Sequence, residues 1–208
     1  MRAQARKALR LLKERLHALP KSARPEAAQV LAAENKVIAL FGAALQHPIE
    51  ARRIRCHGDL HLGQVLFTGK DFIIIDFEGE PARAPSERRL RRSPLYDAAG
   101  MLRSFHYAAQ SVHFERRSSE AAAERLAEEA GAAFIKAYLS RARAGGFLPA
   151  DPVQLRALLD AFCLEKALYE LLYELNNRPA WVRVPLRGII HALKGSSGGG
   201  PKSCKISK

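Results

Sequence analysis

The sequence predicts an α+β fold that is mostly helical, with one small β-hairpin set among the helices. Apolar residues recur at helical spacing over 3–19, where four leucines share one face. Short runs of β-branched and aromatic residues at 65–67 and 72–75 predict two strands, and the Thr-Gly-Lys-Asp segment at 68–71 predicts the turn between them. After Pro94 the pattern is helical almost to the end of the chain.

The other elements follow from the same periodicities and from the residues that interrupt them. Pro20 ends the first helix, and Gly145, Gly146 and Pro149 interrupt the later helical region. In chain order we expect helices at 3–19 and about 25–46, β-type runs at 54–56, 65–67 and 72–75, and helices at about 96–113, 119–144, 153–176 and 187–194. We expect one domain over 1–194, and disorder in the tail 195–208, which lacks core-forming residues.

Composition and charge exclude several classes of protein. The hydrophobic fraction of 48% and the charged fraction of 26% are ordinary for a globular protein, and no run approaches the roughly 18 apolar residues that cross a membrane. The net charge is +13, but the basic residues are interleaved with acids and accompany no nucleic-acid-binding motif, so nucleic acid is set aside as a partner. Cys56, Cys163 and Cys204 are too far apart for a zinc site or a disulfide framework, so we expect a reducing, cytoplasmic location.

Residues 57–80, HGDLHLGQVLFTGKDFIIIDFEGE, carry the pattern that points to chemistry. Asp59 lies on a loop, Gln64 follows it by five residues, and Asp76 begins an Asp-Phe-x-Gly element at the end of the second strand. Phosphoryl transfer needs a carboxylate that orients the attacking hydroxyl and accepts its proton, and oxygen ligands that hold Mg²⁺ against the phosphates. The interval of five matches the kinase catalytic loop. We therefore expect Asp59 to be the catalytic base, and Gln64 and Asp76 to be Mg²⁺ ligands.

Two histidines flank Asp59. We expect His57 to shape the loop by stacking and hydrogen bonding, and not to act as the base itself. His61 has two interpretations, contact with substrate or phosphate and hydrogen bonding to loop carbonyl groups. A metal site made of His57, Asp59 and His61 is a further alternative, but no additional ligand follows at a convincing spacing.

The motif HGDLHLGQVL resembles the catalytic loop of the aminoglycoside-phosphotransferase-like kinases, which usually have Asn where this chain has Gln64. The glutamine, together with the segments DFEGEP, ERRLRRSPLYDAAGMLRSFHYAA and EKALYELLYELNNRPAWVRVPLRGI, resembles the maltokinases. The likeness is strongest to the kinase region fused to the C-terminus of bacterial trehalose synthases. It covers nearly everything from about 50 to 191.

The resemblance implies the C-terminal lobe of a protein-kinase-like fold, with the hairpin as its catalytic β-element. It implies ATP-dependent phosphorylation of maltose to maltose 1-phosphate, with ATP and Mg²⁺ as cofactors and the roles given above for Asp59, Gln64 and Asp76. It also implies that Asp97 holds the backbone of the catalytic loop from the start of a helix. From its position alone Asp97 is a helix cap, and the two interpretations are compatible.

A polar stripe on the helix 153–176 is the candidate sugar site. Lys166, Tyr169 and Tyr173 stand at i, i+3 and i+7 and therefore share one face. Core packing is the usual role of such a stripe, but the polar tips of lysine and tyrosine need partners when buried. We expect these residues to bind the sugar, as the resemblance to maltokinases implies, and Asn177 and Trp181 are candidates to extend the same wall. Taken alone, Trp181 is rather a core residue or an edge anchor.

Arginines are densest after the Asp-Phe-x-Gly element. Arg83 is a candidate to reach into the site, where its guanidinium would steady phosphate or substrate oxygens. We expect the cluster at 88–92 to form a solvated loop or a face that docks another domain, with no catalytic role.

A kinase of this type also has an N-terminal lobe, a β-sheet with a Gly-rich phosphate loop and a strand-borne lysine. The residues before 54 are helical in pattern and contain neither feature. We therefore expect a truncated product or a piece of a longer reading frame, with an upstream N-lobe or a trehalose-synthase domain as partner. Two alternatives stay open: a catalytically weak lobe that serves as a structural piece of such an assembly, and a kinase of the same fold acting on an amino sugar, choline or homoserine.

Overall fold

The computed structural model describes residues 1–43, 48–81, 83–116 and 119–195. Its described part divides into two compact units, unit 1 with 1–49 and 156–195 and unit 2 with 50–155. The tail predicted to be disordered lies, from 196 onward, outside the described residues, as does Cys204. The expectation of one domain over 1–194 stays a prediction.

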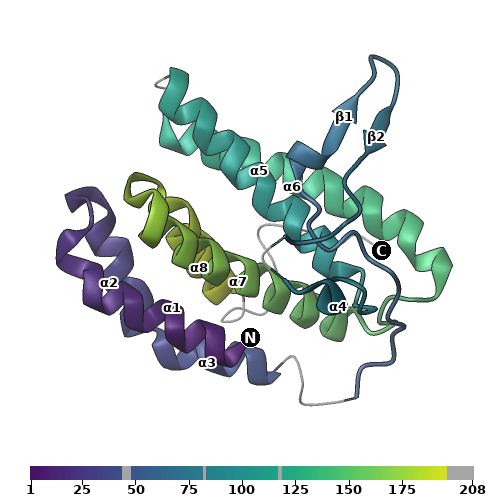
Figure 1. The fold of residues 1–208 in the computed structure, drawn as a ribbon, viewed down its shortest axis with the longest axis horizontal. Helices are drawn as coiled ribbons and strands as arrows, with labels where there is room; N and C mark the ends of the chain where they lie inside the picture. Colours follow the sequence, from purple (N-terminus) through teal and green to yellow (C-terminus); the bar gives the residue numbers. More distant parts are fainter. Residues whose placement is uncertain (44–47, 82, 117–118, 196–208) are drawn as a thin grey trace. The chain divides into compact units, whose positions relative to one another are not determined.

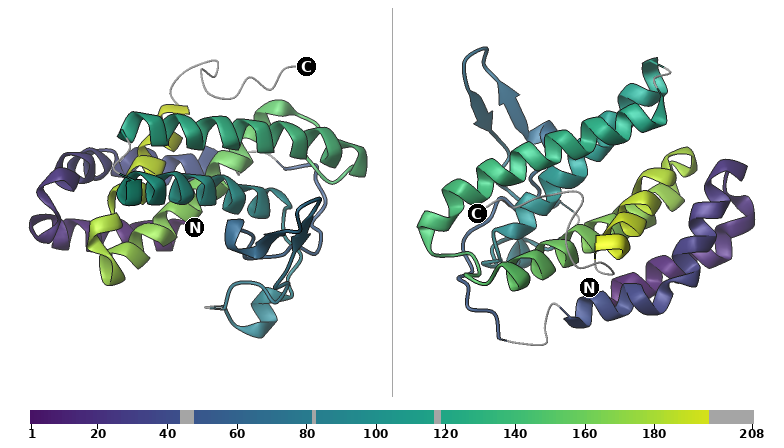
Figure 2. Two further views of the ribbon diagram at one scale, coloured as in Figure 1. Left: turned by 90° about the horizontal axis from the view of Figure 1, so that it is seen from above. Right: turned by 180° about the vertical axis from the view of Figure 1, so that it is seen from behind.

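Unit 1 is entirely helical within the described residues (Figures 1 and 2). It contains α1 (Arg2–Arg15), α2 (Arg24–Ala32), α3 (Glu34–Ala43), most of α7 (Pro152–Asn177) and α8 (Arg183–Gly195), with the short 3₁₀ helices η1 (Leu16–Ala18), η2 (Lys21–Ala23) and η5 (Pro179–Trp181). Helix α2 packs against α1 and α8, and α3 packs against the same two helices. The N-terminal and C-terminal segments of the chain therefore build one unit together.

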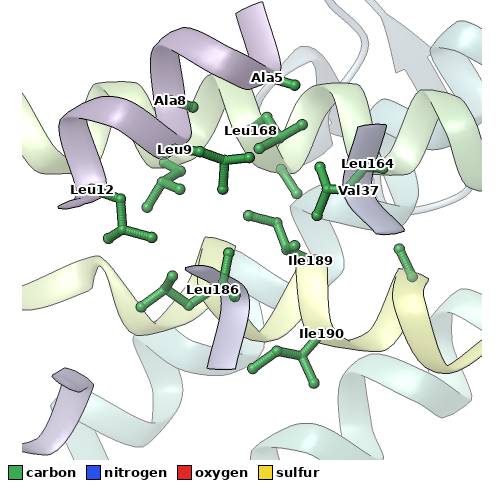
Figure 3. Close-up of a cluster of buried hydrophobic side chains, with 14 of the residues drawn as sticks. Ala5, Ala8, Leu9, Leu12, Val37, Leu164, Leu168, Leu186, Ile189 and Ile190 are labelled. Carbon is green, nitrogen blue, oxygen red and sulfur yellow. The ribbon is translucent and has the colours of Figure 1, made fainter. Parts of the chain in front are cut away.

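A single apolar cluster holds unit 1 together (Figure 3). Its members come from every long helix of the unit and include Ala5, Leu9 and Leu12 of α1, Val30 of α2, Val37 and Phe41 of α3, Leu164, Leu168, Leu171 and Leu175 of α7, and Leu186 and Ile189 of α8. Burying a leucine or isoleucine side chain contributes about 1.5–3 kcal/mol, so this cluster supplies the main driving force for the unit. The leucines at i, i+4, i+7 and i+11 of α7 place one face of that helix in the core and leave the opposite face for other contacts.

The first predicted helices differ from the observed ones in their ends. The helix expected over 3–19 ends at Arg15, and η1 continues the chain to Leu19, where the Arg24 side chain donates hydrogen bonds to the carbonyl groups of His17 and Leu19. The helix expected over about 25–46 is two helices, because the backbone leaves the α-region at Ala33, with φ −96° and ψ 12°. No glycine or proline marks that break, and residues 44–47 lie outside the described part.

Glu26 links α2 to α8 by ionic hydrogen bonds. Its carboxylate accepts from Arg183 at 2.9 and 3.0 Å and from Arg187 at 2.8 Å. Burial alone raises the pKa of Glu26, but the two guanidinium groups outweigh burial and leave that pKa below its ordinary value. A carboxyl whose pKa is lowered by folding stabilises the fold above its unfolded pKa, and this stabilisation is lost as the pH falls through the folded pKa.

The Glu26→Gln variant should therefore unfold more easily at neutral pH than the parent chain. We expect the free energy of unfolding to fall by about 1 kcal/mol at pH 7, a modest loss because water partly screens the pair. The difference should shrink as the pH falls through the lowered pKa of Glu26. Denaturant unfolding followed by circular dichroism across this pH range measures both values. Glu14→Gln, an exposed change on α1, is the control and should have no such pH-dependent loss; a constant difference at every pH would contradict the role given to the Glu26 charge.

Unit 2 is built on a pair of long antiparallel helices, α5 (Leu95–Arg116) and α6 (Glu120–Ala142), which lie side by side in every view (Figures 1 and 2). Small residues line their contact, so the helices approach closely: Ala109, Ala123 and Ala127 form a buried cluster. A Cβ atom on Gly131 would lie 3.3 Å from Cδ2 of Leu102. Nowhere in the described ranges does a helix combine the length and hydropathy of a membrane span.

The hairpin of unit 2 forms where the sequence predicts it. Strands β1 (Val65–Phe67) and β2 (Phe72–Ile74) pair antiparallel, with Val65 opposite Ile74 and Phe67 opposite Phe72. At the turn the Thr68 hydroxyl accepts from the Asp71 N–H at 3.0 Å, and Gly69 adopts φ 91°, which glycine tolerates without strain. Short elements complete the unit: η3 (Leu62–Gln64), α4 (Pro85–Arg88) and η4 (Arg143–Gly145).

The β-type run predicted at 54–56 is reduced to one bridge. Ile54 pairs with Arg92 through N–H···O distances of 2.9 and 3.0 Å, and no strand continues from it. The reason lies in the next backbone groups, because the N–H groups of His57 and Gly58 donate to the Asp97 carboxylate. Those donors are therefore unavailable to a neighbouring strand.

Candidate active site

His57 is the buried centre of the loop that carries Asp59. Its Nε2 lies 2.8 Å from the Ile75 carbonyl oxygen, and its Nδ1 lies 3.4 Å from the Asp59 nitrogen. A carbonyl only accepts and an N–H only donates, so the ring carries its proton on Nε2 and accepts at Nδ1. Phe77 packs 4.9 Å from the imidazole, centroid to centroid. The His57 ring thus ties the loop of Asp59 to the strand end that precedes Asp76.

The Asp97 carboxylate fixes the backbone of the same loop. Its Oδ2 accepts from the His57 N–H at 2.7 Å and its Oδ1 accepts from the Gly58 N–H at 2.9 Å. Asp97 lies in the first turn of α5, but these bonds go to the loop and not to the N-terminus of its own helix. A carboxylate that accepts two backbone N–H groups acts as a rigid clamp, since both bonds are charge-assisted.

Asp59 and His61 lie beside each other on the loop. The Asp59 side chain is 25% exposed, and its Oδ2 lies 4.0 Å from Nε2 of His61. The other ring nitrogen of His61 accepts from the Gly63 N–H at 3.1 Å, so His61 caps η3. His61 was expected to bond loop carbonyl groups, but it accepts from the Gly63 N–H instead. Its contact with substrate or phosphate stays a prediction.

Gln64 and Asp76 are in direct contact. The Gln64 side-chain amide nitrogen donates to Asp76 Oδ2 at 2.9 Å, and the backbone carbonyl of Gln64 accepts from the Ile75 N–H at 3.0 Å. Asp76 has φ 62°, the one positive φ outside glycine in the described residues. A left-handed aspartate costs conformational energy that the surrounding structure has to offset, and such residues cluster at functional sites.

Two glycines bring the two halves of the site together. A Cβ atom on Gly58 would lie 3.3 Å from the Cα of Gly79, and both residues have positive φ, 89° and 83°. Any larger side chain at either position would strain the backbone and crowd the other segment. The loop before Asp59 and the segment after Asp76 therefore pack backbone against backbone.

The donors at this site fit a hard divalent cation. Asp76 is an exposed carboxylate. The Gln64 side-chain amide, whose nitrogen donates to Asp76, also offers its oxygen as a ligand. Mg²⁺ takes one or two such oxygens and keeps several waters, which an open site allows. No group of three His, Cys, Asp or Glu side chains among the described residues is arranged to hold a metal. The metal site built from His57, Asp59 and His61 is therefore not supported, because both His57 nitrogens are engaged within the protein.

Cys56 lies next to the loop, and its surroundings disfavour the thiolate form. Its thiol lies 3.5 Å from the Arg92 carbonyl oxygen. Burial, and then the negative charge of Asp97, raise the pKa of Cys56 to about 11. A thiol with this pKa is largely protonated at neutral pH, which makes Cys56 a poor nucleophile.

The arginines after the Asp-Phe-x-Gly element organise their own loop. Arg83 donates to the Tyr96 hydroxyl at 3.1 Å, and the guanidinium groups of Arg83 and Arg92 lie 5.8 and 5.5 Å from the Tyr96 ring centroid. Arg88 donates to the carbonyl groups of Arg83 and Pro81. Within the cluster at 88–92, Arg88 and Arg92 make these internal contacts, while Arg89 and Arg91 are exposed, as in a solvated loop. A docking role for this cluster stays a prediction.

In unit 1, the polar stripe of α7 lies outside the core. Tyr169 and Tyr173 are 41% and 47% exposed, and Lys166 is partly exposed. Core packing therefore does not account for the two tyrosines. The sugar-binding role of the three residues stays a prediction.

Next to this stripe lies an ion pair that was not predicted from the sequence. The Glu174 carboxylate, 1% exposed, accepts from Arg178 at 3.0 and 2.7 Å, and the Arg178 guanidinium lies 5.3 Å from the ring centroids of both Tyr173 and Trp181. The signal was available, because Glu and Arg at i and i+4 form ion pairs on helices. The place of the Arg178 guanidinium between the Tyr173 and Trp181 rings depends on how the chain turns back through η5 after α7. No local sequence pattern predicts that turn. Arg178 thus fixes the positions of Tyr173 and Trp181 relative to each other.

Comparison with known proteins decides the family. A model of the phosphotransferase enzyme family (APH) matches residues 1–144, more than half of the chain. The chain belongs to this family. The expectation of an aminoglycoside-phosphotransferase-like kinase is therefore confirmed at the level of the superfamily, whereas the maltokinase subgroup stays a prediction.

Two curated relatives of this phosphotransferase-family chain are glucosamine kinases. The protein from Mycolicibacterium smegmatis is 37% identical over 134 residues, which are 62% of this chain and 32% of the relative. The protein from Streptacidiphilus jiangxiensis is 29% identical over 133 residues, 64% of this chain and 30% of the relative. The match thus spans about a third of each relative's length.

Solved structures of a glucosamine kinase share the fold. A structure in complex with glucosamine, ADP and inorganic phosphate superposes with a TM-score of 0.74 at 24% identity, covering 93% of this chain and 47% of that one. A second crystal form gives a TM-score of 0.72 at 22% identity, covering 93% and 46%. The mostly helical fold with a small hairpin is therefore that of about half of such a kinase.

A variant of Asp97 tests how this phosphotransferase-family site is held. Asparagine has one side-chain acceptor oxygen and would turn an N–H donor toward one of the two loop N–H groups, so we expect Asp97→Asn to cost about 1–3 kcal/mol of stability. Amide hydrogen exchange at His57 and Gly58 should accelerate by about tenfold or more. Asp151→Asn is the control, because Asp151 accepts from the Val153 N–H through Oδ1 and asparagine keeps an oxygen for that bond. Unchanged exchange at both loop amides would contradict the clamp.

Proposed function

We propose that this chain is the catalytic and acceptor-binding part of an ATP-dependent sugar kinase. The observation that carries the proposal is the contact between the Gln64 amide and Asp76, whose backbone is left-handed. His57 ties the strand end before Asp76 to the loop that carries Asp59. An amide and a carboxylate at one point, with a second carboxylate on the adjoining loop, are the groups that phosphoryl transfer needs. Membership of a phosphotransferase family supports the same reaction class.

In the proposed mechanism, Asp59 accepts a hydrogen bond from the attacking sugar hydroxyl, orients it and takes its proton as the oxygen bonds to the γ-phosphorus. The bond between that phosphorus and the β–γ bridging oxygen breaks, and ADP leaves. Gln64 and Asp76 would hold Mg²⁺, which when bound neutralises the charge that develops on the phosphate oxygens. Asp97 and His57 keep the loop in place during the reaction, as positioning residues.

The acceptor is proposed from two observations. Relatives named as glucosamine kinases favour glucosamine. The motif with Gln64 and the segment EKALYELLYELNNRPAW favour maltose, the acceptor of the maltokinases they resemble. In both cases we propose that Lys166, Tyr169 and Tyr173 bind the sugar, since tyrosine rings suit its weakly apolar faces and the polar tips suit its hydroxyl groups.

Three further expectations belong to the same proposal. A relative solved with ADP and inorganic phosphate supports ATP as the donor. The chain would be the C-terminal lobe of a kinase-like fold and work in the cytoplasm, without nucleic-acid or membrane partners. Because it spans only about half of the solved relatives, its partner would be an N-lobe that grips ATP, or a larger assembly containing a trehalose-synthase domain.

An acceptor panel tests the proposal. The chain is joined in one polypeptide to the section of the solved glucosamine kinase that has no counterpart in it; we call this protein the fusion. We expect the fusion to transfer labelled phosphate from ATP to glucosamine or maltose with a kcat/KM about 100-fold higher than to choline or homoserine. Each of these two molecules has a single hydroxyl group, so a site built to bond several sugar hydroxyls would be left with unpaired polar groups. The better of the two sugars identifies the acceptor. Transfer to choline or homoserine alone, or to no acceptor at all, would contradict the proposed function.

A further inference from the structure

Arg178 is held at the end of α7 by its backbone. Its N–H donates to the Glu174 carbonyl at 2.9 Å, and its own carbonyl accepts from the Trp181 N–H at 2.9 Å. Pro179 follows and disfavours the helical conformation at position 178, where the backbone has φ −142° and ψ 69°. The chain therefore turns at Arg178, and the turn brings Trp181 back beside it.

A buried carboxylate sets the orientation of the Arg178 guanidinium group. Glu174 is 1% exposed, and a carboxylate at that depth needs a partner for its charge. Nε of Arg178 donates to Oε2 at 3.0 Å and Nη2 donates to Oε1 at 2.7 Å, so one planar fork binds both carboxylate oxygens. Two parallel bonds fix the plane of the guanidinium group as well as its position.

The guanidinium group held in this way contacts two aromatic rings at the surface. It lies 5.3 Å from the ring centroids of both Tyr173 and Trp181, within the range of a cation–π contact. Tyr173 and the side chain of Arg178 are each 47% exposed. The contacts therefore hold a ring where a ligand can reach it, and they do not fill the interior of the unit.

We propose that Arg178 is a positioning residue for the sugar, because its guanidinium group holds the Tyr173 ring in the place where a sugar packs on it; this inference rests on the proposed function. An exposed aromatic side chain has several rotamers available, and a ligand that needs one of them loses affinity by selecting it. Arg178 removes that loss by ordering the ring before the sugar arrives. The property that Arg178 sets is the affinity for the sugar and not the rate of phosphoryl transfer.

The alternative role of Arg178 is an ion pair that only ends the helix. Lysine separates the two roles, since it keeps a positive charge for Glu174 but has no planar group to lie against the rings. A helix-ending ion pair would tolerate lysine without a change in sugar affinity, whereas the positioning role would not.

Arg156 offers a matched control on the same helix. Its Nε donates to the two oxygens of Asp160 at 2.9 and 2.8 Å, so it also forms an ion pair over four residues. Position 156 lies about 25 Å along the helix axis from Tyr173, too far for contact with that ring. Arg156→Lys therefore makes the same chemical change in a similar ion pair away from the tyrosine.

Sugar binding to the chain itself tests the proposal. Trp181 is the single tryptophan of the chain, so intrinsic fluorescence follows a ring that Arg178 contacts. The measured quantity is the Kd of maltose and of glucosamine from fluorescence titration, with titration calorimetry as a second method. For the sugar that binds more tightly, we expect Arg178→Lys to raise the Kd about tenfold, because the cation–π contacts are lost. Arg156→Lys should leave that Kd within about a factor of two.

A second variant weakens the same device from the other side. Glu174→Gln keeps the shape of the side chain but removes the charge that orients the guanidinium group, and it leaves no unpaired charge in the interior. We expect it to raise the Kd about threefold. Circular dichroism establishes that each variant is folded, and Glu174→Gln decides the question if Arg178→Lys does not fold.

Three results would overturn the proposal. The first is a parent chain that binds neither sugar by either method. The second is a folded Arg178→Lys variant, or in its place a folded Glu174→Gln variant, with the Kd of the parent. The third is an Arg156→Lys variant that loses as much affinity as Arg178→Lys, because both would then act through the stability of the helix.

Phosphate transfer by the fusion separates this inference from the proposed function. In the fusion, Arg178→Lys should raise the KM for the sugar about tenfold and leave kcat and the KM for ATP within about a factor of two. Transfer with an unchanged KM for the sugar in this variant would support the kinase and overturn the positioning role. Sugar binding that depends on Arg178, together with a fusion that transfers no phosphate, would support the positioning role and contradict the kinase.

Discussion

Replacing Asp59 by asparagine in the fusion should lower kcat by about 10³-fold, with little change in the KM for ATP. Asparagine has nearly the same shape and keeps one acceptor oxygen, but it cannot take a proton from the sugar hydroxyl. The loop should remain in place, because its backbone is held by Asp97 and His57 and not by the Asp59 side chain. Steady-state kinetics with the preferred sugar measures both constants.

The control for Asp59 is Asp71→Asn. Asp71 is exposed at the hairpin turn, and its Oδ1 accepts from the Phe72 N–H at 2.7 Å, a bond that an asparagine oxygen preserves. The control should retain kcat within about a factor of two, as surface changes usually do. A kcat for Asp59→Asn as high as that of the control would remove Asp59 from the role of base.

Asp76→Asn should produce the second large loss, of about 10³-fold in kcat/KM, together with a higher Mg²⁺ concentration at half-maximal rate. The change removes the charged oxygen ligand, on which Mg²⁺ depends more than on neutral oxygens. Asparagine tolerates the left-handed backbone of position 76 and can still accept from Gln64, so neither strain nor a lost contact explains the effect. Rates measured over a series of Mg²⁺ concentrations report the shift.

A comparison with Gln64→Asn sharpens the test of Asp76. Asparagine keeps the amide oxygen and is the residue usual in the kinases that the loop resembles, so we expect a loss of about tenfold or less. Equal Mg²⁺ dependence in the parent fusion and in Asp76→Asn would show that Asp76 holds no metal. A loss in kcat/KM for Gln64→Asn as large as that for Asp76→Asn would instead show that catalysis depends on the two residues equally.

Local patterns in the sequence predicted the parts of unit 2 that depend on few residues. The hairpin followed from β-type runs separated by Thr-Gly-Lys-Asp, and the observed pairing of Phe67 with Phe72 needs only that turn. The candidate site could also be placed, because Gln64 and Asp76 flank the hairpin and pairing of the strands brings their ends together. The role of Asp97 against the loop required the family resemblance, since no spacing rule relates residues about forty apart.

Other features depend on tertiary contacts that one sequence does not specify. The break at Ala33 has no local signal, and the packing of α2 and α3 against α1 and α8 is a property of the assembled unit. The apolar run at 72–75 predicts a strand but does not tell whether that strand is buried, so the exposure of the apolar hairpin side chains emerges only from the structure. The stacking of Arg178 between Tyr173 and Trp181 is likewise set by how the chain folds back after α7.

The most direct test of the central claim is a crystal structure of the fusion with Mg²⁺, ADP and the preferred sugar. We predict oxygens of Asp76 and Gln64 at about 2.0–2.1 Å from the metal. We also predict an Asp59 oxygen at about 2.6–3.2 Å from a sugar hydroxyl. A metal bound with its phosphates away from Asp76, or a sugar with no hydroxyl in reach of Asp59, would contradict the claim.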